Sequence, residues 1–239
     1  ELRTPLTTIR GFAELYRQGA ARDVEMLMSR IESESRRMGL LVEDLLLLAR
    51  LDAQRPLDQH RVDLLTLATD AVHDAQSIAP QRQISMEVFD GPGTPEVIGD
   101  EPRLRQVLGN LVANALQHTP EWAGIKVRVG TIGPEAVLEV VDEGPGMDQQ
   151  DAQPAFERFY RTDSSRARTS GGTGLGLSIV DSLVHAHGGT VSVATAPGRG
   201  CRFRVTLPRV ADAAERTDGD DEDVLDDVEL INPVLPERL

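Results

Sequence analysis

The sequence predicts an α+β protein in which a helical hairpin is followed by an α/β sandwich, with one layer of helices and one largely antiparallel sheet. Apolar residues recur every seven positions near the start of the chain, which predicts long paired helices. After residue 63, helical and strand patterns occur in separate runs. Two alternating runs, "TVSVATA" and "CRFRVTL", are joined by the turn signal "PGRG" and predict a β-hairpin. The strands do not alternate regularly with helices, so neither a Rossmann fold nor a P-loop fold fits.

Residues 1–52 are predicted to form the helical hairpin. The first helix should span residues 1–18 and end at Gly19, and the second should begin with Asp23 as its N-cap. The second helix carries an apolar residue every seven positions, at Val24, Ile31, Met38 and Leu45. Two antiparallel helices with one apolar stripe each cannot bury it alone, so a second copy is expected to complete a homodimeric four-helix bundle. The alternative is that the hairpin packs on the globular domain of its own chain.

The rest of the chain divides into three parts. Residues 53–62 are predicted to be a polar linker, residues 63–210 the sandwich domain, and residues 211–239 an acidic, disordered tail. Within the sandwich domain, helical periodicity covers residues 64–78, 101–118 and 174–187. Alternating or apolar runs predict strands over residues 83–89, 124–132, 136–142, 190–196 and 201–207.

Charge and composition exclude several classes of protein. The net charge is −14, and residues 211–239 hold eleven acidic and two basic residues, so most of the excess charge lies in the tail. No basic stripe is available to neutralise phosphates, which argues against nucleic acid as a partner. No apolar run reaches the roughly 18 residues of a membrane helix, so we expect a soluble, cytoplasmic chain without membrane contact. The single cysteine, Cys201, excludes a disulfide framework and, lying in an alternating apolar run, is predicted to be a core residue.

One predicted helix carries amides on a single face. In "RLRQVLGNLVANALQHTP", Asn110, Asn114 and His118 are four residues apart, so they share a face opposite the apolar one. Helix interiors disfavour Asn, and an amide oxygen can join the coordination shell of Mg²⁺. A solvated polar face is the alternative interpretation of this row taken alone.

Two glycine-rich segments follow this helix. In "VVDEGPGM" a strand ends at Asp142, and Gly144 and Gly146 permit a turn on which this carboxylate can accept a hydrogen bond from the amino group of a base. In "SGGTGLGLSIV" a run of glycines leads into a helix whose first N–H groups are free to bind a phosphate. Each segment alone is a weak signal, since D-x-G-x-G is often only a turn.

Together the three motifs, which occur in this order within roughly 70 residues, resemble the ATP-binding domain of bacterial sensor histidine kinases, members of the GHKL group of ATPases. "NLVANALQHTP" resembles the N box, "VDEGPGM" and "GGTGLGL" resemble the two glycine boxes, and "FERFYR" resembles the F box. The resemblance extends from residue 1 to about residue 208. It is greatest to PhoR-type sensors of actinobacteria, which partner OmpR-like response regulators.

The resemblance implies an ATP site that uses Mg²⁺ as a cofactor. Asn114 is expected to bind Mg²⁺, Asn110 to lie beside the phosphates, and Asp142 to hold the adenine amino group. The other residues expected to form the site are His118, Gly144, Gly146, Gly172, Thr173, Gly174, Leu175 and Gly176.

The segment between the two glycine boxes is expected to cover the triphosphate as a mobile lid. The resemblance implies that Phe156 and Phe159 anchor this lid, and that Arg161 and Arg166 are candidates to neutralise the γ-phosphate during phosphoryl transfer. Gln117 departs from the family, in which many members have Lys or Arg at this position. An arginine of the lid can supply the cation that this position lacks.

The opening "ELRTPL" resembles the family's H box, His-Glu-x-x-Thr-Pro-Leu, from its second position on. The resemblance implies that Glu1 helps to activate the phosphoacceptor imidazole, that Thr4 serves hydrolysis of the partner's aspartyl phosphate, and that Pro5 kinks the helix. The phosphoacceptor itself is expected before Glu1. None of the histidines within the chain stands in an H-box context: His60, His73, His118, His185 and His187. We therefore predict an intact ATP site in a chain that does not phosphorylate itself.

The predicted function is that of a sensor histidine kinase core. Its parent protein is expected to be anchored in the plasma membrane, to phosphorylate a histidine, and to pass the phosphoryl group to an aspartate of a response regulator. One alternative is another GHKL ATPase, such as an Hsp90-like or MutL-like protein or an anti-sigma kinase, although these lack the H and F boxes. The other is a coiled-coil scaffold with a degenerate nucleotide fold, which would show no Mg²⁺-dependent nucleotide binding.

Overall fold

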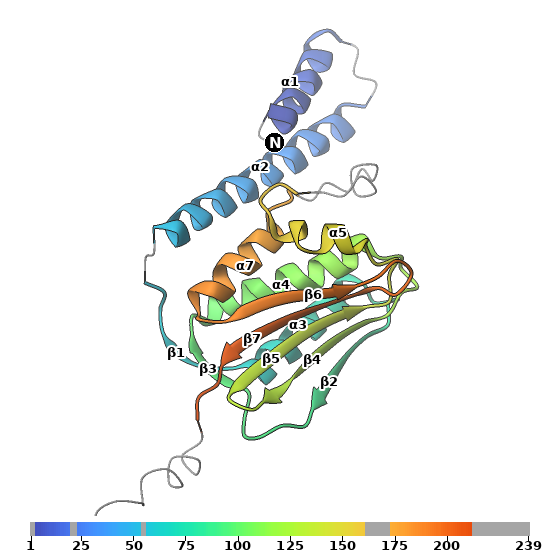
Figure 1. Cartoon of the computed structure of the whole chain (residues 1–239). Coiled ribbons are helices and arrows are strands. Elements are labelled where there is room, and N and C mark those ends of the chain that lie inside the picture. Colours follow the sequence, from blue (N-terminus) through green and yellow to red (C-terminus); the bar gives the residue numbers. More distant parts are fainter. Residues whose placement is uncertain (1–2, 20–22, 54–55, 161–172, 212–239) are drawn as a thin grey trace, which may run out of the picture.

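The computed structural model describes residues 3–19, 23–53, 56–160 and 173–211, and shows a helical hairpin standing on a two-layer domain (Figure 1). The hairpin consists of α1 (Arg3–Arg17) and α2 (Val24–Asp52). In the domain, helices lie on one face of a five-stranded sheet. These helices are α3 (Leu64–Ile78), α4 (Glu101–His118) and α7 (Gly176–Ala186). The predicted class, a helical hairpin followed by an α/β sandwich, is confirmed.

The five-stranded sheet is mixed, with the strand order β2-β4-β5-β7-β6. β2 pairs with β4 in parallel, whereas the other neighbouring strands are antiparallel. The bounds of the strands are β2 (Ile84–Phe89), β4 (Ile125–Ile132), β5 (Glu135–Asp142), β6 (Thr190–Thr195) and β7 (Cys201–Pro208). Each agrees with a predicted strand to within one residue at either end, because β2, β4, β6 and β7 largely alternate between more and less buried positions and β5 is buried along most of its length.

A second, two-stranded sheet is not predicted by the sequence pattern. β1 (His60–Asp63) pairs antiparallel with β3 (Glu96–Gly99), and β1 begins inside the stretch predicted to be a linker. In this register Val62 lies opposite Val97, and both side chains are buried. The small sheet leads directly into α3 and α4, whose N-caps are Asp63 and Asp100. It therefore fixes where α4, the helix that carries the predicted amide row, begins.

The helical layer is held to the sheet by one continuous apolar core. α4 buries the face opposite its amide row, including Leu104, Leu108 and Leu111. α7 buries Ile179 and Leu183 against the same core. Because the apolar positions of α4 recur every three or four residues, burial of this stripe turns the amide row away from the core. α4 has the predicted bounds, and α7 begins two residues after the predicted start of its helix.

The hairpin forms as its sequence pattern predicts. Asp23 caps α2, since its side chain accepts a hydrogen bond from the N–H of Met26 at 2.9 Å. Pro5 of α1 and Leu27 of α2 are buried, whereas Val24 and Met28 are exposed on the single chain. Among the helices that the structure describes, none has the length and apolar character required to cross a membrane.

The second half of α2 packs against the sandwich domain, on α7. Leu41, Leu47 and Leu48 are buried in the same core as the sandwich domain. At the end of α2, Arg158 Nη2 contacts both carboxylate oxygens of Asp52, at 2.7 and 2.9 Å. The packing alternative left open by the sequence thus describes one side of this half of the helix, while apolar side chains on its other side, among them Val42 and Leu46, are exposed.

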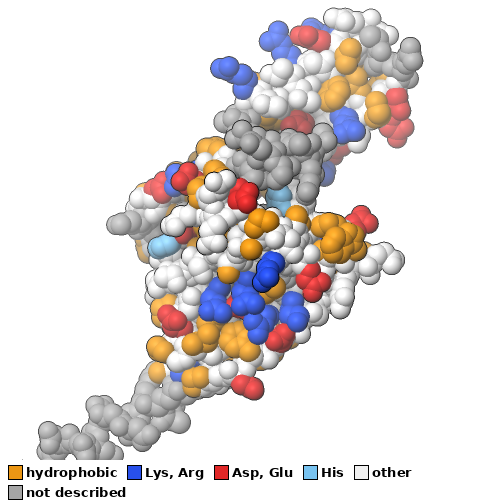
Figure 2. All heavy atoms as spheres, turned by 45° about the vertical axis from the view of Figure 1, so that its right-hand side comes forward, with side chains coloured by type: hydrophobic (Ala, Val, Ile, Leu, Met, Phe, Trp, Pro, Cys, Tyr) orange, Lys and Arg blue, Asp and Glu red, His pale blue; other side chains and the backbone are white. Residues whose placement is uncertain are grey.

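The outer face of the sheet carries a ladder of charges. In the space-filling view, basic side chains gather on the domain below the hairpin, with acidic side chains beside them (Figure 2). In register across β4, β5 and β7 lie Arg128, Glu139 and Arg204. The Glu139 carboxylate accepts hydrogen bonds from Arg128 Nη1 at 2.6 Å and Arg204 Nε at 2.8 Å, and its side chain is only 1% exposed. The two arginines therefore shield this carboxylate from water.

Glu139→Ala is expected to lower the free energy of unfolding by about 2 kcal/mol, because it leaves two facing guanidinium groups without their shared acceptor. Urea denaturation monitored by circular dichroism measures this change. Glu87→Ala is the matched control, since Glu87 also pairs with Arg128 but its side chain is 42% exposed. We expect the control to have little effect. Equal losses in the two variants would contradict a special role for the buried carboxylate.

Candidate functional site

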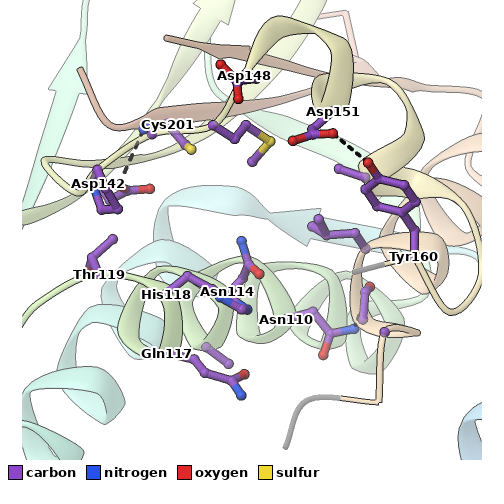
Figure 3. A pocket seen from close by; sticks show the side chains of 18 of the residues that line it. Asn110, Asn114, Gln117, His118, Thr119, Asp142, Asp148, Asp151, Tyr160 and Cys201 are labelled. Carbon is purple, nitrogen blue, oxygen red and sulfur yellow. Dashed lines mark hydrogen bonds between the residues drawn. The ribbon is translucent and has the colours of Figure 1, made fainter. Parts of the chain in front are cut away.

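A cavity of about 460 Å³ opens between α4, the loop after β5, and the start of α7 (Figure 3). The short helices α5 (Gln149–Ala152) and η1 (Pro154–Phe156) and the β6–β7 turn complete its walls. The structure brings together most of the described residues that the sequence predicts for the ATP site. Those that line the cavity are Asn110, Asn114, His118, Asp142, Gly146, Thr173, Gly174 and Gly176.

The amide row of α4 forms the floor of the cavity. Asn110, Asn114 and His118 all line it, one turn of helix apart (Figure 3). The Asn110 Nδ2 group donates a hydrogen bond to the carbonyl oxygen of Gly176 at 3.3 Å, which ties α4 to the start of α7. Gln117, where a cation was expected from the family pattern, also lines the cavity. The row is thus a polar wall of the cavity, not an ordinary solvated helix face.

Asp142 lies at the opposite end of the cavity from the start of α7, at the end of β5. Its side chain is 4% exposed. Its Oδ1 atom accepts hydrogen bonds from the N–H of Gly144 at 2.9 Å and of Cys201 at 3.3 Å. Burial raises the pKa of Asp142, and these two hydrogen bonds and the positive charge of Arg82 oppose the shift. With Oδ1 occupied by the backbone, Oδ2 is the oxygen that can serve a ligand in the cavity.

Two glycines let the chain approach itself closely beside Asp142. A Cβ atom at Gly144 would overlap Cγ2 of Thr119 and would lie 2.8 Å from Oδ1 of Asp142. Gly146 has a φ of +66°, and a Cβ atom there would overlap the carbonyl oxygen of Ala196. The D-x-G-x-G segment is therefore a turn whose glycines are required by space as well as by conformation.

The second glycine segment borders the cavity at the start of α7. Gly174 has a φ of +71°, and its carbonyl oxygen accepts a hydrogen bond from the N–H of Phe159 at 2.8 Å. Thr173 Oγ1 accepts a hydrogen bond from the N–H of Leu175 at 3.3 Å. The F-box segment and the glycine segment are therefore side by side. The first turn of α7 provides backbone N–H groups of the kind that bind phosphate.

Some predicted residues do not line the cavity. Gly144 lies behind Asp142, and Leu175 is fully buried in the core beneath the start of α7. Thr4 is exposed on α1, away from the cavity walls. Phe156 packs edge-to-face on Phe203, with ring centroids 6.2 Å apart. Four of the predicted residues lie outside the described part of the chain, namely Glu1, Arg161, Arg166 and Gly172.

Several cavity residues are missed by motif reasoning. Thr119, Met147 and Tyr160 line the cavity, and the Tyr160 hydroxyl donates a hydrogen bond to Asp151 Oδ1 at 2.7 Å. Cys201 also lines it, although it is partly buried against the core as its apolar run predicts. Its position follows from the pairing of β7 with β5, in which Cys201 lies opposite Asp142. No single-sequence signal specifies that pairing.

The side chains that line the cavity show which atoms could bind the predicted Mg²⁺. Within the described ranges, no group of three or more His, Cys, Asp or Glu side chains could hold a metal ion by itself. The amide oxygens of Asn110 and Asn114 are the neutral oxygen donors at the floor. Such donors suit a hard cation that takes its remaining ligands from water and from the phosphates of a nucleotide.

Two protein-family models match the chain. Residues 1–54 match the His Kinase A (phospho-acceptor) domain, and residues 99–211 match the histidine kinase-, DNA gyrase B- and HSP90-like ATPase domain. The first match covers the helical hairpin. The second begins at the end of β3 and contains the whole cavity.

Individual proteins give the same result. The probable sensor histidine kinase TcrY of Mycobacterium tuberculosis is 48% identical over 212 residues, which are 87% of this chain and 44% of TcrY. The mycobacterial sensor histidine kinase MprB matches in structure with a TM-score of 0.56 and 30% identity, over 64% of this chain and 100% of that one. Full-length ShkA, solved in complex with AMPPNP, matches with a TM-score of 0.65 and 31% identity, over 80% of this chain and 40% of that one. The chain spans less than half the length of TcrY.

Proposed function

This chain belongs to the sensor histidine kinase family, and on that premise we propose that its cavity binds ATP with Mg²⁺ for transfer of the γ-phosphoryl group to a histidine. One observation carries the proposal. A buried carboxylate at one end of the cavity, Asp142, offers a single oxygen as a hydrogen-bond acceptor, and a polar floor leads from it to the start of α7. The adenine amino group is a donor that fits Asp142, and the triphosphate then extends toward Asn110 and Gly176.

Asn114 is the proposed protein ligand of Mg²⁺. It lies between His118 and Asn110 on the floor of the cavity, so its amide oxygen would help to hold the ion there. The ion would neutralise negative charge on the phosphates, as phosphoryl transfer requires. Arg161, Arg166 and Gly172, which lie outside the described residues, are proposed to complete the phosphate end.

The proposed phosphoacceptor is the histidine that the H-box pattern places directly before Glu1. Glu1 is proposed to activate its imidazole, and Thr4 to serve the hydrolysis of the partner's aspartyl phosphate. The support for this assignment is the match of residues 1–54 to a phosphoacceptor domain. We further propose that the receiver domain of an OmpR-like response regulator accepts the phosphoryl group, and that the reaction takes place in the cytoplasm, where ATP is present.

The proposed assembly is a homodimer through the helical hairpin. Apolar residues remain exposed on both helices, including Leu6 of α1 and Val24, Val42 and Leu46 of α2. Their spacing along α2 suits a bundle in which a second copy supplies the missing helices. Patches of this kind on a single chain mark a protein interface.

Removal of Mg²⁺ is expected to weaken nucleotide binding at least about ten-fold, because the phosphates then face the cavity without a counter-ion. Titration with a fluorescent ATP analogue, with Mg²⁺ or with EDTA, measures the difference. Asn114→Ala should lose most of this dependence on Mg²⁺ while retaining the weak binding seen in EDTA. A variant that responds to Mg²⁺ as strongly as the wild type would contradict the assignment of Asn114.

The phosphoacceptor assignment predicts a difference between two N-terminally extended versions of the chain. A version with His directly before Glu1 should acquire acid-labile, alkali-stable phosphate from Mg-ATP, whereas the same extension with Ala should not. Radiolabelled ATP followed by acid and alkali treatment separates phosphohistidine from phosphoserine. Equal labelling of the two versions would show that another residue accepts the phosphate.

A further inference from the structure

The turn between β6 and β7, residues 196–200, lies against the loop that follows Asp142. The N–H of Gly198 donates a hydrogen bond to the carbonyl oxygen of Pro145 at 2.7 Å. On either side of this bond there is no room for a side chain, since a Cβ atom at Gly146 would overlap Ala196 and one at Gly200 would overlap the carbonyl oxygen of Asp142. The two segments are therefore packed backbone to backbone at the Asp142 end of the cavity.

One side chain, Thr195, joins the two segments directly. Its Oγ1 atom accepts a hydrogen bond from the N–H of Met147 at 3.0 Å and donates one to the carbonyl oxygen of Gly200 at 2.9 Å. The Sγ atom of Cys201 lies 3.3 Å from the same oxygen. A hydroxyl group has one proton to donate and two lone pairs, so these three contacts use its full hydrogen-bonding capacity.

Two residues that contact the Thr195 hydroxyl group are walls of the cavity. Met147 and Cys201 both line it, and the N–H of Cys201 donates to Oδ1 of Asp142. Displacement of the 196–200 turn would therefore move two cavity walls and remove one of the two hydrogen bonds that orient the Asp142 carboxylate. Thr195 itself does not line the cavity, so any effect it has on a ligand is transmitted through these neighbours.

We propose that Thr195 is a positioning residue for nucleotide binding, whose hydroxyl holds the 196–200 turn against the loop after β5 and so fixes Asp142, Met147 and Cys201 around the base of the nucleotide. This inference rests on the proposed function for the identity of the ligand. It assigns a role to a residue that lies outside every motif of the sequence. Its geometric part, the attachment of the turn, can be tested without any nucleotide.

The first test compares Thr195→Val, which keeps the shape but removes the hydroxyl, with Thr195→Ser, which keeps the hydroxyl. Thr195→Val should weaken Mg-ATP binding about ten-fold, because the partly buried N–H of Met147 loses its acceptor and the turn loses its attachment. Thr195→Ser should bind within about two-fold of the wild type. Thr190→Val is the matched control, since Thr190 lies on the same strand but is exposed, and its hydroxyl group contacts Oγ1 of Thr206 across the sheet at 3.3 Å.

Isothermal titration calorimetry gives the affinities, and a thermal melt of each variant shows that it is folded. Equal weakening by Thr195→Val and Thr190→Val would assign the effect to the strand and overturn the proposal. So would a Thr195→Ser variant as weak as Thr195→Val, because the hydroxyl would then not be the active group.

The second test uses Cys201 as a built-in reporter, since it is the single cysteine of the chain. Its rate of reaction with a thiol reagent is measured on the nucleotide-free protein. Burial raises the pKa of the Cys201 thiol, and the contact with Thr195 partly opposes that shift. If the turn stayed in place, Thr195→Val would raise the pKa further and slow the reaction.

The proposal predicts the opposite result, at least about a five-fold faster reaction in Thr195→Val, because release of the turn exposes the sulfur. An unchanged or slower reaction would overturn it. Because no nucleotide is present, this outcome is independent of whether the cavity binds ATP. Faster labelling in a protein that fails to bind Mg-ATP would retain the role of Thr195 in the turn and reject the proposed function.

Discussion

Asp142→Asn is expected to weaken Mg-ATP binding about 100-fold, the largest loss for any single substitution at the cavity. Asp142 Oδ1 accepts the N–H groups of Gly144 and Cys201, and Oδ2 is assigned to the adenine amino group. An Asn side chain has one oxygen and one NH₂ group in place of two oxygens. If the oxygen faces the backbone, the NH₂ group meets the amino group of adenine; if the amide is flipped, the NH₂ group meets two backbone donors.

Either orientation places a donor against a donor in a buried position, where an unmatched polar group is most costly. The matched control is Asp148→Asn, because Asp148 also lines the cavity but is exposed at its rim. We expect the control to change affinity by less than about three-fold. Titration calorimetry compares the two. A small effect of Asp142→Asn would place the adenine elsewhere in the cavity.

The burial of Asp142 should also affect how the stability of the nucleotide-free protein depends on pH. Because burial raises the pKa of Asp142 in the folded state, its carboxylate form is destabilising at any pH above the raised value. Between the ordinary value of 3.8 and the raised value, the folded protein binds more protons at this group than the unfolded chain does. The contribution of Asp142 to the free energy of unfolding should therefore rise as the pH is lowered through that window. Urea denaturation at a series of pH values measures this trend, which Asp142→Asn should lack.

Arg82→Met is expected to lower the free energy of unfolding by about 3 kcal/mol, the largest loss of stability among the substitutions considered. Arg82 precedes β2, and its guanidinium group is buried. It donates to the carbonyl oxygens of Ala123 at 3.0 Å and Leu116 at 3.1 Å, and to the hydroxyl of Thr119. One side chain thereby supplies hydrogen-bond donors to acceptors at the end of α4 and in the loop that follows it. Methionine fills the space but leaves these acceptors without a donor.

Arg105→Met is the informative comparison for this prediction. Arg105 forms two ion pairs, with Asp70 and Glu101, but its side chain is 45% exposed. Removal of two exposed pairs should cost about 0.5 kcal/mol or less. Urea denaturation of both variants therefore tests whether burial of the acceptors or the number of charged partners determines the loss. If Arg105→Met lowered the free energy of unfolding more than Arg82→Met, the acceptors of Arg82 would have to form hydrogen bonds with water once the arginine is removed.

Local patterns of the sequence predict much of the fold. The apolar stripes of α3 and α4 are long and periodic, and each is preceded by an aspartate that caps it, so their bounds could be predicted. β1 and β3 could not, because each has only four residues and is stabilised by its partner in space. The parallel pairing of β2 with β4 is likewise a property of the topology that no local pattern reveals.

The residues of the candidate site likewise divide into those that sequence motifs predict and those that contacts in space bring to the cavity. The positions of Asn114 and Asp142 in the cavity could be predicted because the amide row and the D-x-G-x-G segment, each a weak signal alone, occur together in an order that resembles the ATP-binding domain of sensor histidine kinases. Cys201 and Thr195 could not, since their roles come from strand pairing and from a turn that folds back on the loop after β5. An isolated threonine at the end of an alternating run looks like any other strand residue.

The packing of α2 on α7 joins the helical hairpin to the sandwich domain. Leu41 and Leu48 lie two turns apart on one side of α2, and burial of these two side chains together with Leu47 is worth about 6 kcal/mol as apolar area removed from water. Because these leucines belong to the same apolar core as the sandwich domain, separation of the hairpin from that domain would expose them to water at about this cost. The second half of α2 and the sandwich domain are therefore expected to move as one body unless an event supplies a comparable free energy.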